Sequence, residues 1–185
     1  LQNIGVLNKI KFDIEEVGQP ISFRWGKCKL ATASFGHGIT TTPLQLARAY
    51  SILGNGGYKI KPTLIKNNLN TKFNEKIISS KTSDQINTML RNVVFKEEGT
   101  ANFADIEGYE VGGKTGTAMK YNSKEKINTF VALFPSSKPR HVLVVMLDQP
   151  QIAPKDYLFV RPDGKEYKNV KRNESGWNTV VTAGK

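Results

Sequence analysis

Cysteine and histidine are scarce in this sequence, which limits the chemistry that the chain can perform. Cys28 is the only cysteine among the 185 residues, so no intrachain disulfide can form. The two histidines, His37 and His141, show no metal-ligand spacing to cysteine or carboxylate side chains. His37 lies between two glycines and is interpreted as a loop residue, and His141 as the start of a strand. No glycine-rich phosphate loop precedes a helix. We therefore expect no metal, nucleotide or other cofactor.

Long hydrophobic runs are also missing. No segment approaches the roughly 20 apolar residues that a membrane-spanning helix needs. Residues 1–5 include no methionine and no basic segment of the kind that opens a signal peptide. Residues 180–185 show no residue pattern that would end a secondary-structure element. These features favour the interpretation that the sequence is a piece cut from a longer chain.

Acidic residues are few compared with basic ones. The sequence has 16 aspartates and glutamates against 27 lysines and arginines, a formal net charge of +11. The lysines are scattered from Lys9 to Lys185, with no arginine stripe and no interleaved aromatic residues. Nucleic-acid binding usually requires a clustered basic footprint, so we expect no nucleic-acid partner. Attraction to an anionic wall polymer stays open as an alternative.

Hydrophobic periodicity indicates an α+β fold with an antiparallel sheet flanked by helices. It predicts helices over residues 1–15, from Thr42 to residue 53, and from Ser80 or Ser83 to residue 94, an extended segment over residues 58–66, and strands over residues 109–118, 129–134 and 141–147. Helices followed by a cluster of strands are typical of the α+β class.

Two of the predicted helices carry explicit signals. Thr42 and Gln45 form a capping box around Pro43, which suits the first helical position, and the glycines of residues 54–57 stop this helix. The residues predicted to form the apolar faces of the two helices are Leu46, Ala47, Tyr50 and Leu53 for the first, and Ile86, Met89, Leu90, Val93 and Val94 for the second.

Residues 149–175 form a long polar excursion after the last predicted strand of the sheet. A turn signal at residues 162–164 separates residues 158–160 from residues 167–170, which are predicted to pair as a surface hairpin. A last helix is predicted to begin at Gly176.

The most informative motif is Lys114-Thr115-Gly116-Thr117, preceded by two glycines. K-T-G is the third sequence element of the active-serine penicillin-recognising enzymes. In serine acyl transfer, the substrate carboxylate must be held and the oxyanion stabilised. Lys114 supplies a fixed positive charge, and the hydroxyls of Thr115 and Thr117 suit a carboxylate. The backbone N–H of Thr117 suits the oxyanion, and Gly116 leaves room for a substrate backbone along the strand.

The other two elements of such enzymes, S-x-x-K and S-x-N, have no usable match. Ser123-Lys124-Glu125-Lys126 has the S-x-x-K spelling but lies after the K-T-G strand, in a polar run typical of a hairpin tip. Tyr167-Lys168-Asn169 resembles a Y-x-N variant of the second element but lies in the polar excursion. We therefore reject both matches, and no S-x-N occurs in the sequence.

Three segments together resemble the class B penicillin-binding proteins, and within them the cell-division (septal) transpeptidase. They are residues 31–39 (Ala-Thr-Ala-Ser-Phe-Gly-His-Gly-Ile), residues 42–50 (Thr-Pro-Leu-Gln-Leu-Ala-Arg-Ala-Tyr) and residues 113–118 (Gly-Lys-Thr-Gly-Thr-Ala). The similarity runs over nearly the whole chain in the family's order, and includes residues 99–101 and 128–148.

The resemblance implies a D,D-transpeptidase of the α/β transpeptidase fold. Such an enzyme forms a serine acyl-enzyme on a stem peptide, cross-links peptidoglycan and binds β-lactams. It also implies an N-terminal anchor in the inner membrane, a periplasmic catalytic domain and divisome partners that include a glycosyltransferase. By the motif match, Lys114 and Thr117 are the catalytic residues, and Thr115, Gly116 and Thr117 bind substrate.

The sequence departs from the family because the nucleophilic serine, its lysine and the S-x-N loop would all precede Leu1. We therefore expect residues 1–185 to be the C-terminal portion of one transpeptidase domain, with residues 149–175 as an insertion. The alternatives that stay open are a β-lactamase-like hydrolase, a β-lactam sensor, and a non-catalytic module that binds wall polymers through its positive charge.

Overall fold

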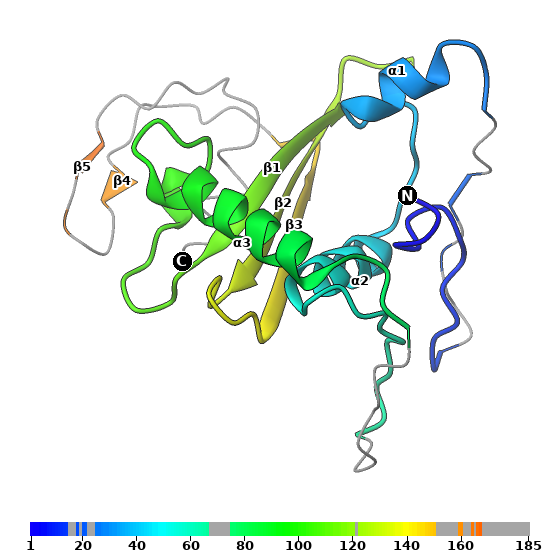
Figure 1. Cartoon of the computed structure of the whole chain (residues 1–185). Coiled ribbons are helices and arrows are strands. Elements are labelled where there is room, and N and C mark those ends of the chain that lie inside the picture. Colours follow the sequence, from blue (N-terminus) through cyan, green and yellow to red (C-terminus); the bar gives the residue numbers. More distant parts are fainter. Residues whose placement is uncertain are drawn as a thin grey trace. The chain divides into compact units, whose positions relative to one another are not determined.

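A computed structural model describes residues 1–14, 18, 20–21, 25–66, 75–120, 122–150, 159–160, 164 and 166–167. The chain divides into two compact units, Leu1–Ser83 and Asp84–Lys185. Figure 1 labels the helices and strands. In chain order the elements are α1 (Lys29–Ser34), α2 (Pro43–Gly54), α3 (Ser80–Phe95), the 3-10 helix η1 (Asn102–Ala104), β1 (Gly112–Met119), β2 (Lys126–Phe134), β3 (His141–Asp148), β4 (Phe159–Val160) and β5 (Glu166–Tyr167). Helices combined with an antiparallel sheet confirm the α+β class.

The first unit begins without the predicted helix. Residues 1–14 are turns and irregular backbone, so the helix predicted over residues 1–15 is wrong. Gly5 has a φ of 79°, a left-handed conformation that glycine adopts without a steric penalty and that ends a helical turn. A Cβ at Gly5 would lie 2.6 Å from the Arg48 guanidinium carbon. The apolar residues that suggested a helix belong to an irregular segment that packs inward, since Val6 and Ile10 are buried.

The capping box of α2 is confirmed. The Thr42 hydroxyl accepts the Gln45 backbone N–H at 3.2 Å, and the Gln45 side-chain oxygen accepts the Thr42 N–H at 2.8 Å. Pro43 is the first helical residue. The Gln45 side-chain amide also donates to the Asn8 carbonyl at 2.7 Å, so this one residue ties the start of α2 to the preceding segment.

The face that α2 buries differs from the predicted one. The buried residues are Gln45, Ala49, Ile52 and Gly54, and none of the four predicted residues is among them. Gln45 is polar, but its hydrogen bonds allow it to be buried. An apolar pattern overlooks Gln45, although two other residues of the buried face, Ala49 and Ile52, are themselves apolar.

Replacing Thr42 with alanine is expected to destabilise the fold by about 1 kcal/mol, because the Gln45 N–H loses its side-chain acceptor. Thr42→Ser keeps the hydroxyl and is the matched control. Urea denaturation of both variants measures the difference. Equal midpoints for the two variants would show that the cap does not contribute.

The loop after α2 ends the helix as predicted. Gly56 and Gly57 have φ values of 87° and 91°. A Cβ at Gly57 would lie 2.1 Å from the Ile78 carbonyl oxygen, so the two segments approach at a distance that requires glycine. In the described part of the chain, the predicted extended segment over residues 58–66 makes a single isolated antiparallel bridge, between Tyr58 and Lys76.

The second unit is built on an antiparallel sheet with the strand order β1-β2-β3. The strands predicted over residues 129–134 and 141–147 are present, extended to Lys126–Phe134 and His141–Asp148. β1 begins at Gly112, three residues later than predicted, because Glu110 has a φ of 48° and leaves the extended conformation. Residues 135–140 connect β2 to β3, in the interval between the two predicted strands.

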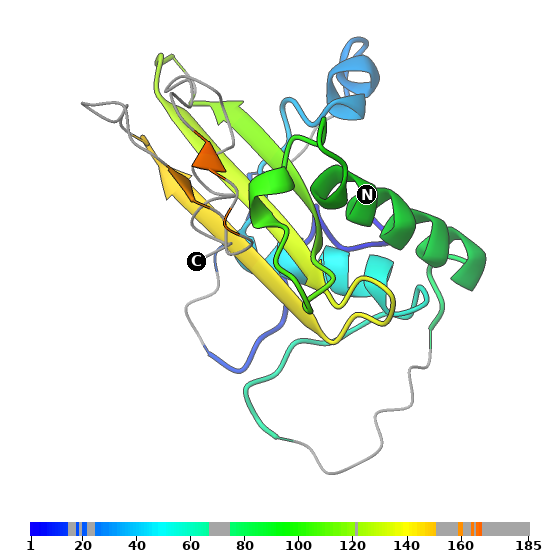
Figure 2. The ribbon, with the colours of Figure 1, turned by 90° about the vertical axis from the view of Figure 1, so that its left-hand side faces the viewer.

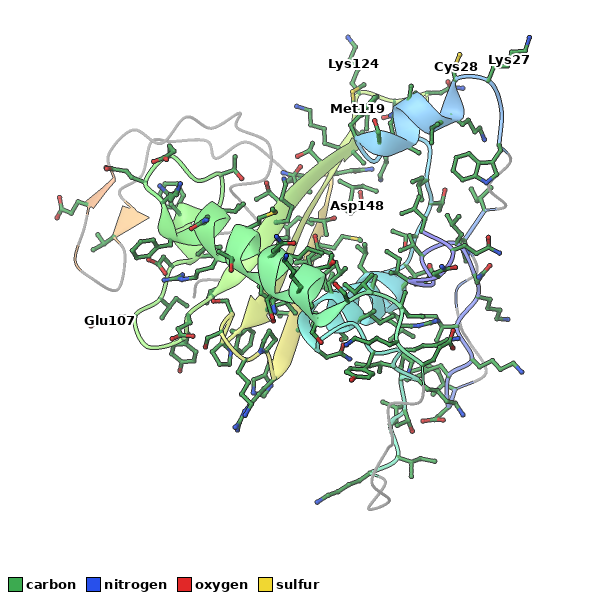
Figure 3. The ribbon with its side chains drawn as sticks, in the orientation of Figure 1. Lys27, Cys28, Glu107, Met119, Lys124 and Asp148 are labelled. Atoms are coloured by element: carbon green, nitrogen blue, oxygen red, sulfur yellow. The ribbon has the colours of Figure 1, made fainter. Side chains whose placement is uncertain are left out.

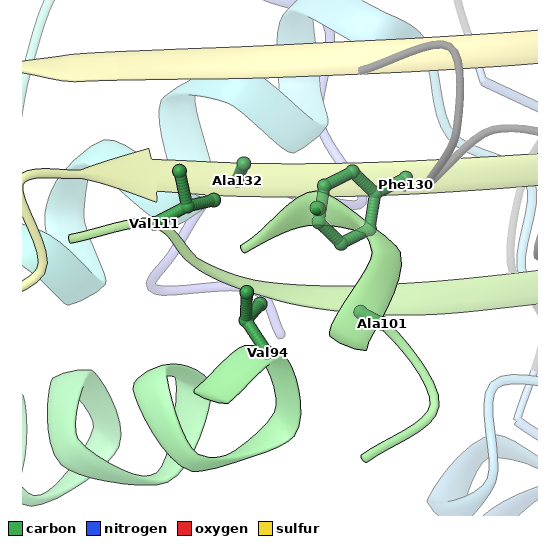
Figure 4. Packing of buried hydrophobic residues seen from close by; sticks show 6 residues of the cluster. Val94, Ala101, Val111, Phe130 and Ala132 are labelled. Atoms are coloured by element: carbon green, nitrogen blue, oxygen red, sulfur yellow. The ribbon is translucent and has the colours of Figure 1, made fainter. Parts of the chain in front are cut away.

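The core of the second unit lies between α3 and one face of the sheet (Figure 2). Its buried members are Val94, Ala101, Ala104, Val111, Phe130 and Ala132. Figure 4 shows the cluster and labels residues from α3, from β2 and from the segments before β1. Phe130 is fully buried. Val111, the residue before β1, packs in this cluster with Phe130 and Ala132 of β2. This packing positions the start of β1.

α3 starts at Ser80, one of the two predicted positions, but its buried face differs from the predicted stripe. Ser83, Asn87, Leu90 and Val94 are buried and Val93 packs against the core, whereas Met89 is 64% exposed. Met89 therefore does not belong to the core face. No helix in the described part of the chain combines the length and hydrophobicity needed to cross a bilayer.

A short hairpin follows the sheet in the sequence and consists of Phe159–Val160 paired with Glu166–Tyr167. This agrees with the predicted surface hairpin where the two overlap. Residues 158 and 168–170, and the helix predicted from Gly176, lie outside the described residues.

Candidate active site

The K-T-G-T residues lie on β1, an edge strand. Among the described residues, β1 pairs only with β2, so one side of its backbone carries no ladder. An edge strand presents unpaired N–H and C=O groups along that side. An extended peptide segment can add to such an edge through main-chain hydrogen bonds.

Lys114 is exposed on this strand, opposite Val131. Its ammonium donates to the carbonyl oxygen of Thr115 at 2.9 Å, so the side chain folds back along the strand. Within the described ranges, no carboxylate pairs with Lys114. The ammonium therefore keeps its charge available for an incoming anionic group.

The two threonines lie on the other face of the strand from Lys114. Successive side chains of a strand alternate between faces, so Thr115 and Thr117 share one face, and Lys114 and Gly116 share the other. Thr117 is exposed and Thr115 is half-buried. A ligand beside an open strand edge can contact side chains from both faces of that strand. β1 provides such an edge.

Two residues next to the threonines were missed by the sequence analysis. The hydroxyl of Thr100 lies 3.3 Å from that of Thr115, within hydrogen-bond distance. Asn128 is buried directly opposite Thr117, and its side-chain oxygen has no hydrogen-bond partner within the described ranges. The available signals were the Gly99-Thr100 pair and an asparagine within a strand of mostly apolar residues.

The glycines of β1 have different surroundings. A Cβ at Gly113 would lie 2.5 Å from the Phe130 ring and 2.8 Å from the Val131 carbonyl oxygen. At Gly116 the nearest atom would be the Thr129 carbonyl oxygen, at 3.9 Å. Gly113 is therefore required by packing of the sheet. Gly116 faces open space, which agrees with room for a ligand.

The end of the β1–β2 hairpin is held by ionic contacts. The Lys120 ammonium lies 2.7 Å from the Asp148 carboxylate and 3.7 Å from that of Glu125. The hydrogen bond with Asp148 raises the pKa of Lys120, so the amine stays protonated. The contact links the end of β1 to the end of β3 across the sheet.

The S-x-x-K spelling falls in this hairpin end, as predicted. Ser123 and Lys124 lie in the turn between β1 and β2, and Lys126 is the first residue of β2. Figure 3 shows Lys124 projecting from the tip, near Met119. An exposed turn does not bring a serine and a lysine together in a dry pocket, so this segment lacks the geometry of a nucleophile. Of the Y-x-N spelling, only Tyr167 is described, as the last residue of β5.

The two histidines are separate in sequence from the K-T-G-T residues, and each stacks on a phenylalanine ring. His37 is exposed between Gly36 and Gly38, both with positive φ, and stacks on Phe35 with ring centroids 6.2 Å apart. His141 is the first residue of β3 and stacks on Phe134. The described residues include no cluster of three side chains suited to a metal ion.

An open groove also lies on the second unit, along α3, and is called the α3 groove here. It is lined by one face of α3, by Glu110 and by Ser136 and Ser137. None of the K-T-G-T residues lines it. The candidate active site is therefore the exposed edge of β1, and the α3 groove is a separate feature.

The sequence matches the penicillin-binding protein transpeptidase domain over residues 1–166. The chain belongs to this family. The match includes α2, α3 and the whole three-stranded sheet with the K-T-G-T residues.

Curated relatives in the family carry transpeptidase and sporulation names. The probable peptidoglycan D,D-transpeptidase FtsI of Caulobacter vibrioides is 34% identical over 164 residues, which cover 80% of this chain and 28% of that protein. Stage V sporulation protein D of Bacillus subtilis is 35% identical over 170 residues, covering 82% of this chain and 26% of that protein. The chain thus spans about a quarter of the length of these relatives.

Solved structures show the same fold. The apo transpeptidase domain of penicillin-binding protein 3 from Burkholderia pseudomallei is 32% identical with a TM-score of 0.74, and the alignment covers 80% of this chain and 47% of that one. The transpeptidase domain of FtsI4 from Legionella pneumophila is 28% identical with a TM-score of 0.61, covering 89% and 51%.

Proposed function

We propose that residues 1–185 are the C-terminal portion of the catalytic domain of a peptidoglycan D,D-transpeptidase of the septal class. The observation that carries the proposal is the edge strand β1. On it, an ammonium and a backbone edge that have no carboxylate or strand partner among the described residues occur together with an open glycine position. This combination suits a peptide that lies along the strand with a carboxylate at its end.

In this proposal, each K-T-G-T residue has a defined role. Lys114 provides positive charge beside the nucleophilic serine and assists transfer of its proton. The hydroxyls of Thr115 and Thr117 bind the terminal carboxylate, and the N–H of Thr117 donates to the oxyanion. Gly116 lets the substrate backbone approach β1, because a Cβ there has no neighbour closer than 3.9 Å.

The reaction is acyl transfer in two steps. The serine oxygen attacks the carbonyl carbon of the penultimate D-alanine of a stem peptide, and the terminal D-alanine leaves as the free amino acid after its nitrogen takes up a proton. The amine of a second stem peptide then attacks the resulting ester, forms the cross-link and releases the serine hydroxyl. A β-lactam enters the first step as a cyclic amide and remains attached.

The serine, its lysine and the S-x-N loop are proposed to come from a part of the protein outside residues 1–185. The proposal extends to an inner-membrane anchor, a periplasmic catalytic domain and divisome partners that include a glycosyltransferase. Fractionation of cells and co-purification with membrane-bound division proteins test these expectations.

The full-length protein is expected to become covalently labelled by a fluorescent penicillin, whereas residues 1–185 alone are not, because the one S-x-x-K of their sequence, at residues 123–126, lies at the β1–β2 hairpin end. Gel fluorescence after denaturation measures the label, and mass spectrometry identifies the modified serine. Labelling of a serine within residues 1–185, or the absence of label on the full-length protein, contradicts the proposal. Rapid release of hydrolysed penicillin would instead indicate a β-lactamase.

A further inference from the structure

The proposed function leaves the α3 groove without a role. Its volume is about 580 Å³, within the range of roughly 300–1,000 Å³ that small-ligand sites occupy. The residues contributed by α3 are spaced three, four, seven, eight and eleven positions after Asp84, so they form one continuous face of the helix. Glu110, Ser136 and Ser137 form the facing wall.

Hydrogen bonds hold the two walls in place. The Ser136 N–H donates to the Glu110 carbonyl oxygen at 2.8 Å, and the Ser137 hydroxyl donates to the Glu110 carboxylate. The Arg91 guanidinium donates to Asp105 at 2.7 Å and to the Val111 carbonyl oxygen at 2.8 Å. The α3 groove is therefore formed before any ligand binds, which lowers the entropic cost of binding.

The charges of the α3 groove disfavour an anionic ligand. Among the described residues that line it, Asp84 and Glu110 are acidic and Arg91 is the only base. The Arg91 guanidinium is already bonded to Asp105 and to the Val111 carbonyl. A phosphate or a peptide carboxylate would meet two acidic groups and no uncommitted cation. The α3 groove thus differs from the rest of a chain whose net charge is +11.

Neutral polar side chains make up most of the remaining lining. They are Asn87, Thr88, Asn92, Ser136 and Ser137. The Thr88 and Ser137 hydroxyls already donate to the Asp84 carbonyl oxygen and the Glu110 carboxylate, but their oxygens can still accept hydrogen bonds. Amides and hydroxyls together can both donate and accept, so they suit a ligand whose own groups do both. Among the described residues that line the α3 groove there is only one large apolar side chain, so they do not form the clustered aromatic anchors of a protein-docking site.

That apolar side chain is Phe95, at the end of α3. It is 65% exposed, and the Arg91 guanidinium carbon lies 4.9 Å from its ring centroid. An exposed ring beside amides and hydroxyls matches a sugar, which has an apolar C–H face and a rim of hydroxyl groups. Each feature of the α3 groove therefore has a counterpart on an uncharged saccharide.

We propose that the α3 groove binds a neutral oligosaccharide, the glycan backbone of peptidoglycan. The inference rests on the proposed function only for the identity of the polymer, since the chemistry of the α3 groove selects a neutral sugar by itself. Binding of the glycan by the α3 groove holds the polymer on the protein while its peptide branches react at β1.

The test uses the full-length protein and a β-1,4-linked tetramer of N-acetylglucosamine, with affinity measured by titration calorimetry. We expect a Kd on the order of 1 mM or tighter. Phe95→Ala and Asn92→Ala are each expected to weaken binding by about tenfold. The matched controls on α3 are Met89→Ala, whose side chain is 64% exposed, and Gln85→Ala, an exposed amide; neither lines the α3 groove.

Penicillin labelling separates this proposal from the proposed function. The two groove variants are expected to retain penicillin labelling, and Lys114→Ala to retain tetramer binding. The full-length protein could fail to be labelled by penicillin and still bind the tetramer, with weaker binding in the groove variants. That result would support the saccharide site and contradict the proposed transpeptidase function. No binding at about 10 mM tetramer, equal binding by groove and control variants, or displacement of the tetramer by inorganic polyphosphate would overturn it.

Discussion

Replacing Lys114 with alanine in the full-length protein is expected to reduce the second-order rate constant of penicillin acylation by about a hundredfold or more. Removal of one group that stabilises developing charge typically costs this much. The Lys114 ammonium has no carboxylate partner in the described part of the chain and bonds only a neighbouring carbonyl, so its charge is not balanced locally. The fold should therefore tolerate the change while the chemistry does not.

The control for this prediction is Lys124→Ala, which removes the same charge from the tip of the same hairpin. It is expected to leave acylation within about twofold of the parent protein, because an exposed charge at that position is screened by solvent. Stopped-flow or gel-based labelling with a fluorescent penicillin measures both variants. Similar rates for Lys114→Ala and the parent protein would exclude Lys114 from the reaction.

Replacing Gly113 with alanine is expected to destabilise the protein by about 3 kcal/mol. The new Cβ would lie 2.5 Å from the Phe130 ring and 2.8 Å from the Val131 carbonyl oxygen. Phe130 is fully buried in the core and Val131 belongs to β2, so neither has free space into which to move. Overpacking of a filled core typically costs 1–3 kcal/mol and occasionally more. Each kcal/mol lowers the midpoint of thermal unfolding by roughly 2–4 °C in a domain of this size.

Gly116→Ala is the matched control, since its Cβ would lie 3.9 Å from the nearest atom. We expect its unfolding midpoint to stay within about 2 °C of the parent's, while acylation falls because the methyl group occupies the path of the substrate. Thermal unfolding and penicillin labelling, measured on both variants, distinguish the two glycines. Equal losses of stability would show that the difference in packing has no energetic effect.

The sequence predicts most of the sheet but not its details. The apolar runs of β2 and β3 locate both strands within three residues, because an alternating or continuous apolar pattern is a local property. The start of β1 was missed because it depends on the left-handed backbone at Glu110, a residue type with no strong preference for that conformation. The helix predicted over residues 1–15 fails because Gly5 interrupts it and packs against Arg48.

The sequence motif predicts which residues form the candidate site, but it does not predict their contacts. K-T-G-T identifies the strand, but the contact of Thr115 with Thr100 comes from tertiary packing. The same holds for the buried face of α2, where Gln45 is inside because it makes hydrogen bonds. Polar residues buried through specific partners are invisible to a pattern that counts hydrophobicity.

The open side of β1 also bears on how the protein behaves in concentrated solution. A free strand edge is a template on which another chain can pair, and lysines on such edges oppose that association because like charges repel. Lys114 is exposed on this edge strand, so its charge is expected to oppose pairing between copies of the chain. Neutralising this position is therefore expected to increase self-association, in addition to any effect on the proposed reaction.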